Sequence, residues 1–139
     1  MATFPLLLGL SAALAAPPAP KTVFASRSDA PVVIDGRADD AVWSSAETRS
    51  DFTERTPDLG ATPRLKVSFQ VAFDDLNLYV LIRHEGLDRP VRVRSLRRDS
   101  WGVFTGDWTS VKIDPLHDRR TSYSFITNPD GVQVDVLGL

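Results

Sequence analysis

The sequence predicts an all-β fold, an antiparallel sandwich of six to eight short strands. Residues 65–73 show the cleanest alternation of apolar and polar side chains in the chain, which is the period of a strand with one buried face. Turn residues such as Asp35-Gly36 and Asn128-Pro129-Asp130-Gly131 separate the expected strands, at the spacing of about 8–12 residues that is typical of sandwiches. The chain has 139 residues, which is enough for one domain.

The first half of the chain is expected to hold three strands and one helical turn. Residues 31–34 form a short strand that Asp35-Gly36 ends, and residues 39–43 form a helical turn whose Trp43 fills one end of the core. Residues 78–83 return as the hairpin partner of residues 65–73, after a turn at 74–77. In the strand at 65–73 the alternation predicts a buried face of Leu65, Val67, Phe69, Val71 and Phe73, and an exposed face of Lys66, Ser68 and Gln70.

The second half is expected to supply four more strands. Residues 91–94 alternate valine with arginine, which suits an edge strand because charge discourages further pairing. Residues 106–115 read as a central strand with Thr109, Val111 and Ile113 on its buried face, and Pro115 ends it because proline has no N–H for a ladder. Strands at 121–127 and 132–137 follow, on either side of the turn at 128–131.

The first twenty residues carry no charged side chain and are mostly apolar from Phe4 to Leu14. This run is too short to span a bilayer, which needs about 20 apolar residues. Ala13-Leu14-Ala15 has the small-x-small form of a signal-peptidase site. We therefore expect a signal peptide at residues 1–16, a Pro/Ala-rich linker at 17–28, a β-sandwich domain at 29–139, and export from the cell; a disordered tail is the alternative for the first segment.

Composition excludes several classes of function. The net charge of −2 gives no reason to expect a nucleic-acid partner. Without cysteine there is no disulfide, thiolate metal site or cysteine nucleophile. The two histidines, His84 and His117, stand in no nucleophile or zinc motif, and neighbouring acids such as Asp39 and Asp40 do not show a catalytic pair across a cleft. The chain is therefore expected not to be an enzyme.

Two tryptophans and several charged residues gather just before the central strand. Sugars bind by stacking a ring face on aromatic side chains and by hydrogen bonds from their hydroxyls to planar polar groups. A predicted saccharide site therefore consists of Trp101, Trp108, Arg97, Arg98, Asp99 and Asp107. As alternatives, Trp101 folds onto the sandwich edge, Trp108 packs under a neighbouring strand, and the arginines from Arg92 to Arg98 form a solvated edge or contact an acidic sugar or a lipid phosphate.

Four segments, at residues 34–43, 73–80, 106–115 and 123–131, resemble in their order and spacing the family 9 carbohydrate-binding modules, beginning with Ile34-Asp35-Gly36-Arg37. The resemblance covers about Val32 to Asp135. It implies an immunoglobulin-like β-sandwich that binds carbohydrate, accessory to glycoside hydrolases, in an exported bacterial protein with a larger C-terminal domain resembling an outer-membrane barrel. Because the family pattern continues past Asp135, we expect a sandwich that is missing its last strands.

Three functions follow as hypotheses. The first is a non-catalytic carbohydrate-binding module in the periplasm, at the outer membrane or outside a bacterium, whose partner is an oligo- or polysaccharide. The second is a structural domain that docks on its own C-terminal domain or on another envelope protein. The third is a haem- or metal-binding relative that uses His84 or His117. No cofactor and no transmembrane helix is expected. Two groups of residues have oxygen atoms that could bind calcium: Asp74, Asp75 and Asn77, and Asp107 and Asp114. The alternative interpretation, which we favour, is that they are ordinary turn residues.

Overall fold

The computed structural model describes residues 21–86 and 89–138. They form a mostly β structure, which confirms the expected all-β class. Two three-stranded sheets have the orders β1-β2-β3 and β4-β5-β6, and every pairing is antiparallel except that of β1 with β2. The elements are β1 (Ser26–Arg27), α1 (Ala41–Ser45), β2 (Lys66–Phe73), β3 (Leu78–Glu85), the 3-10 helix η1 (Trp101–Thr105), β4 (Thr109–Ile113), β5 (Ser122–Thr127) and β6 (Gln133–Gly138).

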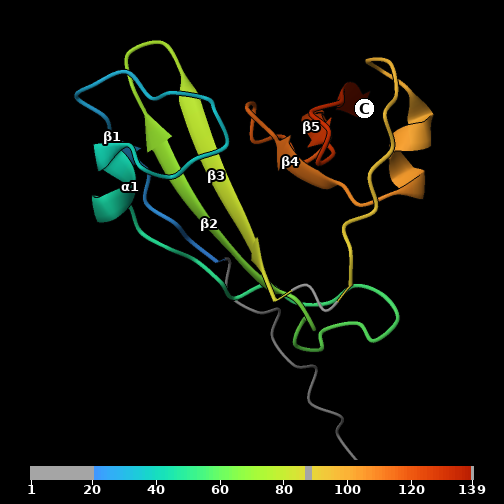
Figure 1. Cartoon of the computed structure of the whole chain (residues 1–139). Coiled ribbons are helices and arrows are strands. Elements are labelled where there is room, and N and C mark those ends of the chain that lie inside the picture. The colour runs from blue at the N-terminus through green and yellow to red at the C-terminus, as the bar shows by residue number, and fades with distance from the viewer. Residues whose placement is uncertain (1–20, 87–88, 139) are drawn as a thin grey trace, which may run out of the picture.

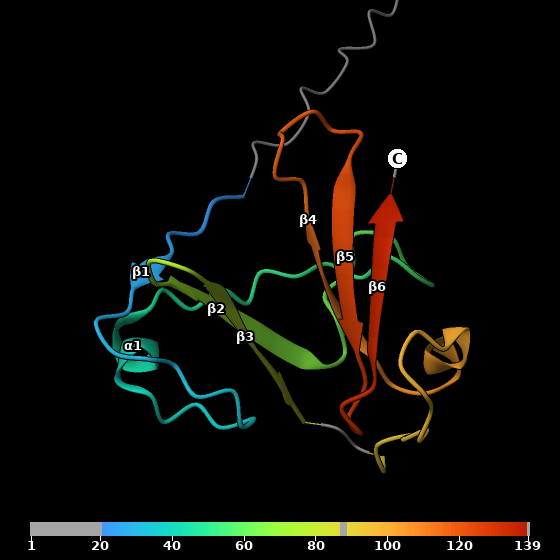
Figure 2. The same cartoon turned by 90° about the horizontal axis from the view of Figure 1, so that it is seen from above.

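The two sheets lie opposite each other, and each carries a helix on its outer side (Figure 1). Helix α1 lies on the side of the first sheet that faces away from the second sheet. The 3-10 helix η1 lies on the far side of the second sheet, and the view from above agrees (Figure 2). The remaining face of each sheet therefore looks toward the other sheet.

The core of the first sheet lies under α1. Val42, Trp43 and Ala46 pack there against Ala72 of β2. The indole of Trp43 is 6% exposed and its N–H donates to Oδ2 of Asp40 at 3.2 Å. The expected core position of Trp43 is confirmed.

The predicted faces of β2 were wrong. Gln70 was expected to be exposed and is 2% exposed, while Val67, Phe69, Val71 and Phe73 are only half-buried. The reason is that α1 covers the side of the sheet that carries Gln70 and Ala72. The Gln70 amide donates at 2.8 Å to each of the carbonyl oxygens of Trp43 and Ala46, so its burial costs no hydrogen bond.

A second core lies between η1 and the second sheet. Val103 of η1, which is fully buried, packs with Ile126 of β5 and Val134 of β6. The alternation expected for the central strand is confirmed, because Thr109, Val111 and Ile113 are half-buried while Ser110 and Lys112 are exposed. The neighbouring side chains of Tyr123, Phe125 and Leu137 remain about half-exposed.

Two expected strands are absent from the part of the chain that the structure describes. Residues 31–34 are irregular, and the Val33 N–H donates to Oδ1 of Asp40 at 3.1 Å instead of joining a ladder. Residues 91–94 are also irregular: the Arg92 carbonyl accepts one hydrogen bond from the Asp107 N–H, and the segment forms no strand ladder. The hairpin of residues 78–83 with β2 and the final two strands are confirmed.

The expected signal peptide at residues 1–16 lies outside the described residues, as do residues 17–20 of the expected linker. The remaining part of that linker contains β1, whose Ser26 and Arg27 pair with Ala72 and Phe73. Among the described residues no helix is long and apolar enough to cross a membrane.

The turn between β2 and β3 is built on Asp74. Its Oδ1 accepts the backbone N–H groups of Leu76 and Asn77 at 2.8 and 2.7 Å. The Tyr79 hydroxyl donates to Oδ2 at 2.6 Å. The Tyr79 hydrogen bond, followed by the bond from the Leu76 N–H, lowers the pKa of Asp74 to about 2.

This geometry makes the turn sensitive to acid. Because the folded-state pKa of Asp74 is below its unfolded value, its contribution to stability is full above about pH 4 and is lost as the pH falls toward 2. In Tyr79→Phe the pKa of Asp74 should rise toward its ordinary value, and part of the acid-sensitive stability should disappear. Carboxyl chemical shifts of Asp74 measured by NMR against pH test this; an unchanged pKa in the variant would show that the hydroxyl does not hold the carboxylate.

Candidate functional site

Three aromatic side chains form a continuous exposed group before β4, which we call the aromatic row: Trp101, Phe104 and Trp108. The ring centroids of Trp101 and Phe104 are 5.6 Å apart, and those of Phe104 and Trp108 are 5.1 Å apart in an edge-to-face arrangement. The side chains are 69%, 37% and 45% exposed, respectively. The structure therefore brings together the two predicted tryptophans through a phenylalanine that the sequence analysis missed.

The local sequence explains why the row forms. The Ser100 hydroxyl accepts the Gly102 N–H at 3.3 Å and starts η1. In a 3-10 helix residues three apart stand one above the other, so Trp101 and Phe104 share a side while Val103 is buried beneath. The interval of three residues between the two aromatics was the signal that could have identified Phe104.

Gly106 brings the chain close to the segment before η1. A Cβ atom at this position would lie 2.8 Å from the Arg92 carbonyl oxygen, which is too close for any residue with a side chain. The Asp107 N–H donates to the same oxygen at 2.9 Å. The start of β4, with Trp108, is thus held against Arg92.

Asp107 is held in an ion pair. Its carboxylate accepts two hydrogen bonds from the Arg89 guanidinium, at 2.6 and 2.8 Å, and one from the Arg92 N–H at 2.8 Å. These partners, Arg89 first, hold the pKa of Asp107 well below its ordinary value. Asp107, which was predicted to bind sugar hydroxyls, thus fastens residues 89–92 to the start of β4.

Arg98 and Asp99 lie along the outer edge of β6. The Arg98 guanidinium donates to Oδ2 of Asp135 and to Oε1 of Gln133, each at 2.5 Å. Asp99 has a φ of 60°, and its N–H donates to the Gln133 carbonyl at 2.9 Å. Asp99 thus occupies backbone hydrogen-bonding positions of β6 that a neighbouring strand would use, which protects this edge. Arg97 is exposed and forms no ion pair with the described residues.

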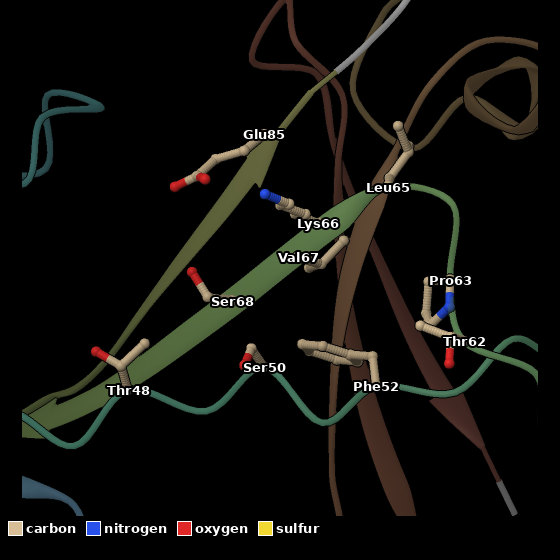
Figure 3. A pocket seen from close by; sticks show the side chains of 10 residues that line it. All are labelled: Thr48, Ser50, Phe52, Thr62, Pro63, Leu65, Lys66, Val67, Ser68 and Glu85. Atoms are coloured by element: carbon tan, nitrogen blue, oxygen red, sulfur yellow. The ribbon is translucent and has the colours of Figure 1, made fainter.

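A cavity of about 420 Å³ opens beside Trp108 and is lined from both sheets. Its lining includes Trp108, Asp107, Arg89, His84, Leu65 and Thr127. A second hollow, of about 380 Å³, lies on the first sheet between the segment at 48–52 and the start of β2 (Figure 3). Phe52, Pro63, Leu65 and Val67 supply its apolar side chains, and none of the predicted site residues lines it.

Two of the carboxylates considered for calcium hold backbone turns, and a third, Asp75, pairs with Arg27. Asp74 accepts the bonds described above, and Asp114 accepts the N–H groups of Asp118 and Arg119 at 3.3 and 2.7 Å. In the described ranges no three side chains of histidine or acidic residues stand together as metal ligands would. His84 and His117 are both exposed.

No family model, no curated protein and no solved structure matches this chain. The site itself must therefore carry the functional argument. It offers exposed aromatic faces, a neighbouring cavity and arginine side chains, all of which suit non-covalent binding.

Proposed function

We propose that the chain is a non-catalytic carbohydrate-binding module, with the aromatic row as the surface that binds sugar rings. The observation that carries this proposal is the exposure of both predicted tryptophans within one continuous group. Large aromatic faces left in water cost free energy, and stacking on the apolar face of a sugar ring recovers part of it.

Trp101 is the main stacking residue in this proposal, because it is the most exposed member of the row. Trp108 stands at the other end of the aromatic row, where it lines the 420 Å³ cavity, and it would contact a ligand there. The row is open and shallow, so few contacts form and the affinity should be weak, micromolar at best. Any hydrolase activity would belong to another protein or domain.

The proposed fold is an immunoglobulin-like sandwich whose halves are the two sheets. Support comes from the apolar residues on the facing sides of both sheets, such as Phe69 of β2 and Phe125 of β5. The apolar leader and the resemblance to exported modules support a place in a bacterial envelope.

A titration of tryptophan fluorescence with a panel of soluble oligosaccharides tests the proposal. We expect a saturable change for at least one sugar. In Trp101→Ala the affinity should fall by roughly tenfold, which corresponds to about 1.4 kcal/mol of lost stacking. The control Trp43→Phe should keep the affinity, because Trp43 lies in the core away from the row.

The alternative function is docking on another protein domain, and one observation favours it. Tyr123, Phe125 and Leu137 leave apolar surface about half-exposed on the inner side of the second sheet. A chain whose circular dichroism shows folded β-structure, and which responds to no sugar, would reject the carbohydrate proposal in favour of docking.

A further inference from the structure

We infer that the saccharide is acidic, carrying carboxylate or sulfate groups, and that Arg94 and Arg97 recognise those groups beside the aromatic row. This inference rests on the proposed function and narrows its ligand class. It depends on three observations: the path of the chain before η1, the distribution of ion pairs along it, and the charge of the whole protein.

The segment at 92–97 runs directly alongside η1 and the start of β4 (Figure 2). The Leu96 side chain lies 3.1 Å from the position of a Cβ on Gly102, within η1. Cγ of Arg94 lies 3.7 Å from the corresponding position on Gly106. The stem of the Arg94 side chain therefore packs against Gly106, in the backbone that connects Phe104 to Trp108.

The arginines between positions 89 and 98 differ in their partners. Arg89 is paired with Asp107, and Arg98 with Asp135 and Asp99. Arg94 and Arg97 form no ion pair or side-chain hydrogen bond with any residue that the structure describes. Asp107 and Asp135 are thus engaged by Arg89 and Arg98, and Asp130 accepts from the Ser95 hydroxyl. None of these carboxylates is paired with Arg94 or Arg97.

The positive charge of Arg94 and Arg97 is opposite in sign to the net charge of the whole chain. The protein carries a net charge of −2, so a free polyanion is not attracted to it in general. At this surface a ring could stack on Trp101 while its anionic substituent meets a guanidinium. Guanidinium groups bind carboxylates and sulfates through two parallel hydrogen bonds, which a neutral sugar cannot accept with equal strength.

The test compares matched ligands on the full chain. Oligogalacturonate is titrated against its carboxyl-reduced neutral form, and a sulfated galactan oligosaccharide against its desulfated form. We expect the anionic member of at least one pair to bind about tenfold more tightly, and added salt to remove that advantage. The double variant Arg94→Gln/Arg97→Gln should lose the advantage and keep the affinity for the neutral form.

Arg120→Gln is the matched control, because Arg120 is an exposed arginine on the loop between β4 and β5. It should bind the anionic sugars as the parent chain does. Circular dichroism verifies that each variant folds.

Each remaining result overturns the inference in a recognisable way. Equal affinity for the anionic and neutral members leaves the carbohydrate proposal standing and rejects the acidic ligand. Failure of all four ligands rejects the acidic ligand, and the wider sugar panel then decides the proposed function. Binding to phosphatidylglycerol vesicles that needs the two arginines and does not need Trp101 would show that the surface recognises lipid phosphate.

Discussion

Replacing Trp43 with alanine should lower the free energy of unfolding by about 3–5 kcal/mol, the usual cost of removing a large buried aromatic side chain. The indole is 6% exposed and packs with Val42, Ala46 and Ala72. Removing it leaves a cavity under α1 and takes the hydrogen-bond donor from Oδ2 of Asp40. Since small domains have only about 5–15 kcal/mol of stability, the variant should retain little.

Urea denaturation followed by circular dichroism measures this loss. Trp101→Ala is the matched control, because its side chain is 69% exposed and its removal should change the unfolding free energy by no more than about 0.5 kcal/mol. If the two variants were equally stable, the core assigned to α1 and the first sheet would be incorrect.

The strands with tight turns were predictable from the sequence, because their signals are local. The hairpin of β2 with β3 follows from alternation on both sides of the Asp74 turn, and β5 with β6 follows from the turn at 128–131. The segments at 31–34 and 91–94 have the same composition as strands. They differ because Asp40 and Asp107 supply hydrogen-bond partners from elsewhere in the chain, and no local pattern encodes those partners.

The candidate site was predictable in its position and only partly in its members. Two tryptophans near one strand start were enough to place it, and Phe104 joins them because η1 has a three-residue repeat. The charged residues could not be sorted from the sequence. Asp107 and Arg98 find partners at Arg89 and Asp135, which are 18 and 37 positions away, and such pairing depends on the fold.

Gln70 gives the second large expected effect. Its amide nitrogen serves the carbonyl oxygens of Trp43 and Ala46, both at 2.8 Å, and Arg83 donates to its Oε1. In Gln70→Leu the size of the side chain is nearly kept, but both carbonyl oxygens lose their donor in a buried place. Each buried acceptor without a partner costs about 1–3 kcal/mol, so the free energy of unfolding should fall by about 2–6 kcal/mol.

The control variant Ser68→Ala separates the loss of the Gln70 hydrogen bonds from the effect of any substitution in β2. Ser68 lies on the same face of β2, two residues away, and its hydroxyl is not required by either carbonyl. This control should change the unfolding free energy by about 0.5 kcal/mol or less. If the strand followed a simple apolar alternation, Gln70 would be exposed. Gln70→Leu would then leave the free energy of unfolding nearly unchanged. If Gln70→Leu unfolds at the same urea concentration as the parent chain, α1 does not cover this face. If it loses stability as expected, the polar residue in the alternation is the one that joins the helix to the sheet.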